Sequence, residues 1–150
     1  MVNGVLVSGG TIDKPMGRHP RDRQRMAVLS SGGRHAITHY RVLSRYRAHS
    51  LLAVMLDTGR THQIRVHMAS EGHPIVGDPV YGGRPRVPRG AASELLECLR
   101  GFRRQALHAF RLRFAHPASG EAMQFEAPLP EDMRTLIAAL QADCQEHADD

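Results

Sequence analysis

The chain has 150 residues, 41% of them hydrophobic and 23% charged, which is typical of a single globular domain with one core. No apolar run approaches the roughly 20 residues that cross a bilayer, and the N-terminus lacks the layout of a secretory signal. Cys98 and Cys144 are far apart and outside any CxxC spacing, which favours reduced thiols over a disulfide scaffold or a zinc site. These features predict a cytoplasmic protein without a membrane partner.

The charge balance is basic. The formal net charge is +5 at pH 7, and of the 20 basic residues all except Lys14 are arginine. An arginine-rich domain suggests a phosphate-bearing partner, RNA in particular, because arginine both pairs with phosphate and stacks on bases. A coding sequence biased toward arginine codons would give the same imbalance, so composition alone leaves both explanations open.

The first 35 residues predict little regular structure. Val5 to Val7 predicts a short strand, and Ser8-Gly9-Gly10 a turn. Residues 13–35 show neither helical nor strand periodicity and predict a surface loop, for which phosphate contact and mere solvation are both open. The loop contains a group of basic residues: Lys14, Arg18, Arg21, Arg23, Arg25 and Arg34. Asp22 lies in this solvated loop, and we reject it as a catalytic carboxylate.

Residues 36–45 and 50–57 predict two strands of a half-exposed antiparallel hairpin, because polar and apolar positions alternate along them. Tyr40 lies in the first strand. Judged from its position alone, its aromatic ring fills space between the strands.

A short helix is predicted from about residue 60 to 71, after a turn at Thr58-Gly59 and before the stop at Gly72 and Pro74. At 100° per residue, one face of this helix carries Thr61, Ile64, Arg65 and Met68. A second face carries Arg60, Gln63 and His67, which we interpret as a solvated or ligand-facing stripe.

Arg65 is the unusual member of the first face, because it shares that side with Ile64 and Met68. A guanidinium that faces an apolar interior is costly unless a carboxylate meets it. We therefore expect an acidic partner and a two-pronged, planar salt bridge. A purely structural buried pair, or an arginine that extends past Met68 to solvent, would also satisfy the pattern.

The remaining chain predicts a second basic loop at 77–91, a short amphipathic helix at 92–101, and a strand at 105–115 with at least one buried face. Leu107 lies in that strand and, from spacing alone, belongs to the core. A return strand at 121–126 and a closing helix from about Glu131, docked on the sheet by an apolar stripe, complete a mixed α/β (α+β) fold.

Motifs for metal and nucleotide sites are missing from the sequence. The ten histidines include no HExxH or Cys/His cluster, and His62 and His67 are five residues apart, so they do not share a helix face. No P-loop or GxGxxG fingerprint occurs either. We expect no metal and no nucleotide cofactor.

Several separated segments resemble the RluA-type RNA pseudouridine synthases. They are GTIDKPMGRHPRDRQRM, AITHYRVL, GRTHQIRVHMASEGHPIVGDPVYGG, RQALHAFRLRFAHPASG and FEAPLPEDM, and they span nearly the whole chain in order. The resemblance implies a pseudouridine synthase fold with a largely antiparallel sheet and flanking helices. It also implies isomerisation of uridine to pseudouridine in large-subunit ribosomal RNA by an enzyme that needs no cofactor. We expect a monomer.

The resemblance implies roles for individual residues. Tyr40 corresponds to a tyrosine that stacks on the target uracil, Leu107 to a leucine that lines the uracil pocket, and Arg65 to the salt-bridge partner of the nucleophilic aspartate. Nine further residues are predicted to bind RNA: Arg18, Arg21, Arg23, Arg60, His62, Gln63, His67, Arg84 and Arg86.

The nucleophile itself is missing. In the family it lies in an HRLDxxTSG-like motif, and no such string occurs between Met1 and Asp150. We expect residues 1–150 to be the C-terminal portion of a catalytic domain, incomplete on its N-terminal side, without the upstream aspartate motif and S4-like domain, and inactive alone. Arg65 would then lack its normal partner, at a cost of several kcal/mol. The alternative is a non-catalytic RNA-binding remnant; a DNA-binding module is disfavoured because no helix-turn-helix or zinc pattern is visible.

Overall fold

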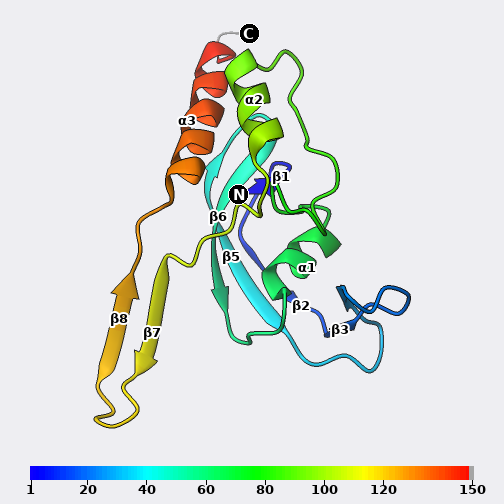
Figure 1. The fold of residues 1–150 in the computed structure, drawn as a ribbon, viewed down its shortest axis with the longest axis vertical. Coiled ribbons are helices and arrows are strands. Elements are labelled where there is room, and N and C mark those ends of the chain that lie inside the picture. Colours follow the sequence, from blue (N-terminus) through cyan, green and yellow to red (C-terminus); the bar gives the residue numbers. More distant parts are fainter. Residues whose placement is uncertain (149–150) are drawn as a thin grey trace.

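The computed structural model describes residues 1–148, whose main feature is an antiparallel sheet (Figure 1). Its strands, in order across the sheet, are β1 (Val2–Asn3), β6 (His49–Leu56), β5 (Ile37–Arg45) and β2 (Gly10–Asp13). All neighbouring pairs in it are antiparallel. The long β5–β6 hairpin confirms the prediction for residues 36–57, as expected for an alternating pattern sustained over eight or nine residues.

Three helices accompany the sheet among residues 1–148: α1 (Gln63–Ser70), α2 (Ser93–Gly101) and α3 (Glu131–Glu146). Helix α1 contacts both β5 and β4, and α2 packs beside α3 (Figure 1). The buried leucines of α2 and α3 join one core cluster with residues from the sheet and from α1; the leucines are Leu95, Leu99, Leu136 and Leu140. The mixed α+β class and the predictions of α2 and α3 are confirmed. No helix in this described part of the chain combines the length and apolar character of a membrane span.

The N-terminal predictions need correction. Val5 and Val7 are exposed, Val7 by 87%, and lie outside any strand, in the segment between β1 and β2. Residues 13–35 are not a plain loop, because they contain the hairpin of β3 (Met16–Arg18) and β4 (Met26–Val28). Strands of three residues are too short to show a period-two pattern, and of these six residues only Met16 is fully buried.

The strand predicted at 105–115 is shorter and more exposed than expected. Only β7 (Arg111–Ala115) is a strand, and it pairs with β8 (Ala122–Glu126) in a separate two-stranded sheet. The expected buried face is wrong in this structure, since every residue of β7 is exposed, including Leu112 at 59%. Figure 1 gives the reason: the hairpin extends away from the main sheet, so its alternating pattern meets no core.

A substitution pair tests where the core lies. Leu136 is 1% exposed between α2 and α3, so Leu136→Ala should lower the free energy of unfolding by about 2 to 5 kcal/mol. Leu112→Ala removes the same atoms from the exposed hairpin and should cost about 0.5 kcal/mol or less. Urea denaturation measures both. Equal losses would contradict this placement of the core.

Candidate active site

The N-terminus of α1 is held by the side chain of Gln63. Its Oε1 accepts hydrogen bonds from Thr58 Oγ1 (2.8 Å) and from Arg60 N (2.9 Å). Its Nε2 donates to Ile37 O (2.9 Å) and to Thr38 Oγ1 (3.1 Å). These bonds tie the turn before the helix to strand β5. They explain why the helix begins at residue 63, after a left-handed residue, and not at residue 60.

A buried relay continues from Gln63 along the inner side of α1. Thr38 Oγ1 receives the Gln63 amide and lies 2.8 Å from His67 Nδ1, while His67 Nε2 lies 2.9 Å from Lys14 O. The carbonyl of Lys14 can only accept, which assigns the His67 proton to Nε2 and leaves Nδ1 to accept from Thr38. Burial lowers the pKa of His67, so the ring is neutral at pH 7.

This relay corrects two sequence predictions. Gln63 is 2% exposed and His67 is fully buried, so the stripe that they were expected to form does not face solvent, although Gln63 lines a cavity beside α1. Their polar atoms bind β5 and Lys14, which a helical wheel cannot reveal because those partners are distant in sequence. The predicted contact of His67 with RNA is contradicted by its complete burial, whereas the contact of Gln63 stays a prediction.

Arg65 is the central charged group of the site. Its Nε donates to Asp78 Oδ2 (2.7 Å) and its Nη2 to Asp78 Oδ1 (2.9 Å). Arg65 is 9% exposed and the Asp78 side chain is fully buried. The two-pronged acidic partner expected for Arg65 is therefore supplied within the chain. The expected cost of an unpaired buried arginine does not arise.

The Asp78 carboxylate is held in place for its bond to Arg65 by the turn that follows it. Its Oδ1 also accepts the backbone N–H groups of Val80 (2.9 Å) and Tyr81 (3.0 Å). Burial by itself would raise the pKa of Asp78, but the bonds from Arg65 and from these amides outweigh burial and lower the pKa below 3.8. The bond to Asp78 in turn raises the pKa of Arg65. Both groups are ionised at neutral pH.

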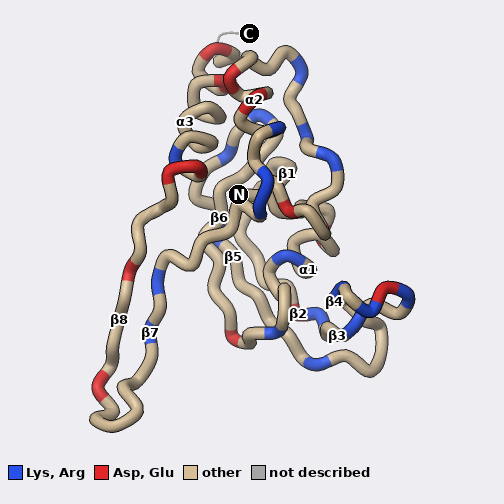
Figure 2. Tube along the Cα trace, in the orientation of Figure 1, with Lys and Arg blue, Asp and Glu red and all other residues tan. Residues whose placement is uncertain are grey.

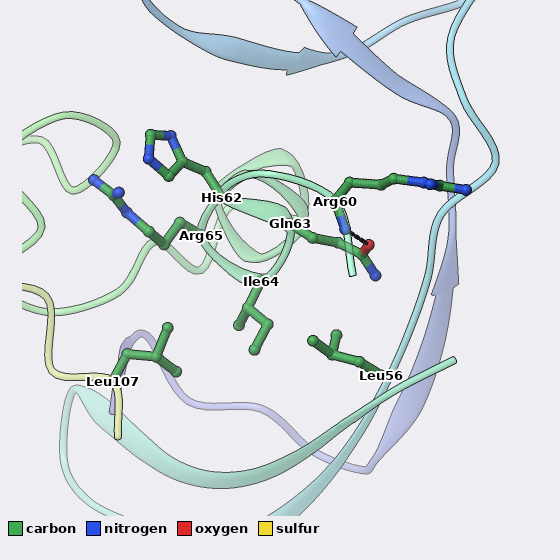
Figure 3. A pocket seen from close by; sticks show the side chains of 7 residues that line it. All are labelled: Leu56, Arg60, His62, Gln63, Ile64, Arg65 and Leu107. Atoms are coloured by element: carbon green, nitrogen blue, oxygen red, sulfur yellow. Dashed lines mark hydrogen bonds between the residues drawn. The ribbon is translucent and has the colours of Figure 1, made fainter. Parts of the chain in front are cut away.

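A cavity of about 190 Å³ lies beside α1. Figure 3 shows Leu56, Ile64 and Leu107 turned toward one space, while the head groups of Arg60 and Arg65 point away from it. These five residues line the cavity together with His62 and Gln63. The cavity thus has an apolar floor and polar margins. No carboxylate of residues 1–148 lines it.

The structure brings together two of the three residues predicted to be catalytic. Arg65 and Leu107 line the same cavity, whereas Tyr40 is not among its lining residues. Tyr40 lies on β5 opposite Val54 and Gly10 and packs against the main core cluster. Its stacking on uracil stays a prediction.

Most of the residues predicted to bind RNA lie at the surface. Arg18, Arg21 and Arg23 are exposed on the β3–β4 hairpin, and Arg84 and Arg86 are exposed on the loop between α1 and α2 (Figure 2). Arg60 and His62 are half-buried at the cavity. All seven can be reached from outside, and their contacts with RNA stay predictions.

Sequence reasoning assigned no role to Asp78, Tyr81, Leu56 or Ile64. Asp78 had a detectable signal, because it is an acid placed directly after the buried Ile75-Val76 segment and a glycine. The other three had none, since apolar and aromatic side chains in such a segment are ordinary core residues.

The RNA pseudouridylate synthase family matches residues 2–70. Two relatives, both called ribosomal large subunit pseudouridine synthase D, come from Xanthomonas campestris (58% identical over 95% of this chain) and Escherichia coli K12 (54% over 98%). The chain belongs to the RluA/RluD-type pseudouridine synthase family. It spans less than half of these relatives, 43% and 45% of their lengths.

Solved structures of pseudouridine synthases agree with this membership. Human RNA pseudouridylate synthase domain containing 1 has a TM-score of 0.66 and 28% identity, with 94% of this chain and 63% of that chain covered. Human RNA pseudouridylate synthase domain containing 4 has a TM-score of 0.67 and 26% identity, with 93% of this chain and 59% of that chain covered. The pseudouridine synthase fold predicted from the motifs is thereby confirmed.

The buried ion pair can be tested against an exposed pair of the same geometry. Asp78→Asn leaves Arg65 buried without a counter-charge and should lower the free energy of unfolding by about 3 to 5 kcal/mol. Asp132→Asn changes an equally bidentate but exposed pair with Arg104, and its effect should be much smaller. Similar urea midpoints for the two variants would contradict the role assigned to Asp78.

The same pair predicts a pH dependence. Because the pKa of Asp78 is lower in the folded chain than its ordinary 3.8, its contribution is complete above about pH 3.8 and is lost as the pH falls through the folded value. The stability difference between wild type and Asp78→Asn should therefore stay constant from pH 7 to pH 5 and shrink below pH 3.8. Urea titrations at each pH measure it, and a difference independent of pH down to 2 would contradict the assignment.

Proposed function

We propose that residues 1–150 form the C-terminal portion of the catalytic domain of an enzyme that isomerises uridine to pseudouridine in large-subunit ribosomal RNA. The names of the similar proteins support the reaction and the substrate. The observation that carries the proposal is Arg65, held at the margin of an apolar cavity by a bidentate bond to Asp78.

In this proposal the cavity receives a uridine that has left its stack. The reaction breaks the bond between uracil N1 and the ribose, turns the base, and joins the ribose to uracil C5, whose proton is released while N1 gains one. Atoms balance without a co-reactant, so no cofactor is required. Leu56, Ile64 and Leu107 give the base an apolar surface on which to turn, and Tyr40 stacks on it.

Arg65 would hold the nucleophilic aspartate ionised and oriented. Nε and Nη2 are committed to Asp78, which leaves Nη1 as the guanidinium nitrogen with no bond to another described residue. We propose that Nη1 pairs with that aspartate. Arg65 would then lie between two carboxylates, a fixed one that positions it and a second one that reacts.

We propose that the reacting aspartate lies outside residues 1–150. Asp78 is fully buried and bound to Arg65, and Asp57 and Asp13 lie on the surface beside His39 and His35. None of these lines the cavity. The 150-residue chain by itself would therefore bind RNA without turnover.

The exposed arginines of the β3–β4 hairpin and of the loop after α1 would contact the RNA backbone, which carries one negative charge per nucleotide. Such contacts set the position of the RNA and do not read its sequence. We propose a monomeric, cytoplasmic enzyme, in keeping with an RNA-modifying role.

A chimaera tests the proposal. Residues 1–150 replace the matching segment of the Escherichia coli relative, and ribosomal RNA tritiated at uracil C5 reports turnover as released tritium. We expect release by the chimaera, none by the 150-residue chain, and a loss of at least about 100-fold for Arg65→Ala in the chimaera.

Two outcomes would contradict the account. Turnover by the 150-residue chain would require a nucleophile between Met1 and Asp150. A folded chimaera that binds RNA but releases no tritium would favour a non-catalytic RNA-binding remnant.

A further inference from the structure

Tyr81 lies at the end of the turn that holds Asp78. The turn is closed by a bond from Gly82 N to Asp78 O (3.0 Å), and a Cβ at Gly82 would come within 2.4 Å of that oxygen. Because the Asp78 carboxylate also accepts the Tyr81 N–H, the backbone of Tyr81 is fixed from two sides. The backbone that carries its ring is therefore held by the same residue that binds Arg65.

The Tyr81 ring contacts two guanidinium groups. The Cζ atom of Arg65 lies 5.0 Å from the ring centroid and that of Arg25 lies 5.2 Å from it, both within the range of cation–π attraction. His62 meets the same ring edge-on at 5.7 Å. Among residues 1–148, Tyr81 is the one aromatic residue whose ring lies beneath two guanidinium groups.

The Tyr81 hydroxyl joins two more elements. It accepts the backbone N–H of Met26 in β4 (2.9 Å) and lies 3.0 Å from His62 Nδ1, before α1. Since the N–H of Met26 occupies the oxygen as an acceptor, the phenolic proton is free to be donated to His62 Nδ1. Burial lowers the pKa of His62 and the Arg65 cation lowers it further, which agrees with a neutral, accepting ring.

Arg25 connects this group to the basic hairpin. Its Nη2 donates to Val80 O (2.7 Å), and its backbone binds both Asp22 O and His19 N within the β3–β4 hairpin. Arg21 and Arg23 are exposed four and two residues before it, respectively. A set of contacts thus runs from the backbone of the β3–β4 hairpin, which carries these exposed arginines, through Arg25 and Tyr81 to Arg65.

We propose that Tyr81 is a positioning residue that holds the Arg65 guanidinium and couples it to the β3–β4 hairpin, so that RNA binding at the hairpin and the orientation of Arg65 depend on one side chain. This inference rests on the proposed function. The aromatic ring of Tyr81 contacts the Arg65 guanidinium, and its hydroxyl bonds the β3–β4 hairpin and His62. These two roles can be separated by substitution.

Tyr81→Phe removes only the hydroxyl. In the chimaera we expect KM for ribosomal RNA to rise about fivefold, the worth of a lost hydrogen bond, with kcat nearly unchanged. Tyr81→Leu also removes the ring, and kcat should fall about tenfold in addition. If Tyr81 only stabilised the fold, the two variants would not separate a change in KM from a change in kcat.

Phe102→Leu is the matched control. Phe102 lies under Arg104 at 5.3 Å, and Arg104 forms a bidentate pair with Asp132 outside the cavity. This variant removes an aromatic ring from a second arginine–aspartate pair, and neither kcat nor KM should change by more than about twofold.

The Nε–Hε signal of Arg65 in a ¹⁵N NMR spectrum gives a readout that does not depend on turnover. The signal is assigned by its loss in Arg65→Lys. In the 150-residue chain it should keep its position in Tyr81→Phe and shift or broaden in Tyr81→Leu.

The outcomes separate this inference from the proposed function. Without tritium release by the unsubstituted chimaera the proposed function fails, and the Arg65 signal still decides whether Tyr81 positions it. With release, the inference is overturned by an unchanged KM in Tyr81→Phe, or by an unchanged kcat and Arg65 signal in Tyr81→Leu. Should Tyr81→Leu not fold, the KM of Tyr81→Phe decides the matter alone.

Discussion

The geometry of the site depends on one buried ion pair, Arg65 with Asp78. A guanidinium at 9% exposure is tolerable only because a fully buried carboxylate meets two of its nitrogens. The carboxylate is stabilised in turn by two backbone amides of its own turn. The pair therefore joins the helix that carries Arg65 to the turn that follows the Ile75-Val76 segment. Helix α1, which this pair fixes, contributes Gln63, Ile64 and Arg65 to the lining of the cavity.

A second polar network holds the other side of the same helix. Gln63, Thr38 and His67 form a relay between α1 and β5, in which Gln63 Nε2, Thr38 Oγ1 and His67 Nε2 each donate to an acceptor. Satisfied buried networks fix one arrangement of neighbouring elements, because any shift would leave a polar group without a partner. Helix α1 is thus bound to β5 by the relay and to the turn that begins at Asp78 by the ion pair. The cavity beside this helix is lined by the apolar side chains of Leu56, Ile64 and Leu107.

The long elements could be predicted from the sequence because their patterns repeat. The β5–β6 hairpin and helices α2 and α3 carry enough alternating or amphipathic positions to be recognised. The two- to four-residue strands β1 to β4 are too short for any period. The hairpin of β7 and β8 has a strand pattern but no described element to bury it. An alternating sequence therefore predicts an extended strand, but whether a face of that strand is buried depends on the elements that pack against it.

The site was predictable only in part for the same reason. An arginine on an apolar helix face requires an acid, and the bidentate geometry follows from the shape of the two groups. The identity of that acid depends on the path of the chain through 13 further residues, which no local rule supplies. Gln63 and His67 were predicted to lie on a solvated or ligand-facing stripe because a helical wheel contains no information about β5. Tyr81 resembled an ordinary aromatic residue until its contacts with Arg25, Arg65 and His62 were visible.

A double-mutant cycle on Arg65 and Asp78 tests the central claim most directly. The free energies of unfolding of wild type, Arg65→Met, Asp78→Asn and the double variant give the coupling between the two side chains. The account predicts a coupling of about 2 to 3 kcal/mol, with the double variant more stable than the sum of the single losses would allow. A coupling near zero would show that Arg65 and Asp78 do not hold each other in the folded chain, and the structural basis proposed for the site would fall.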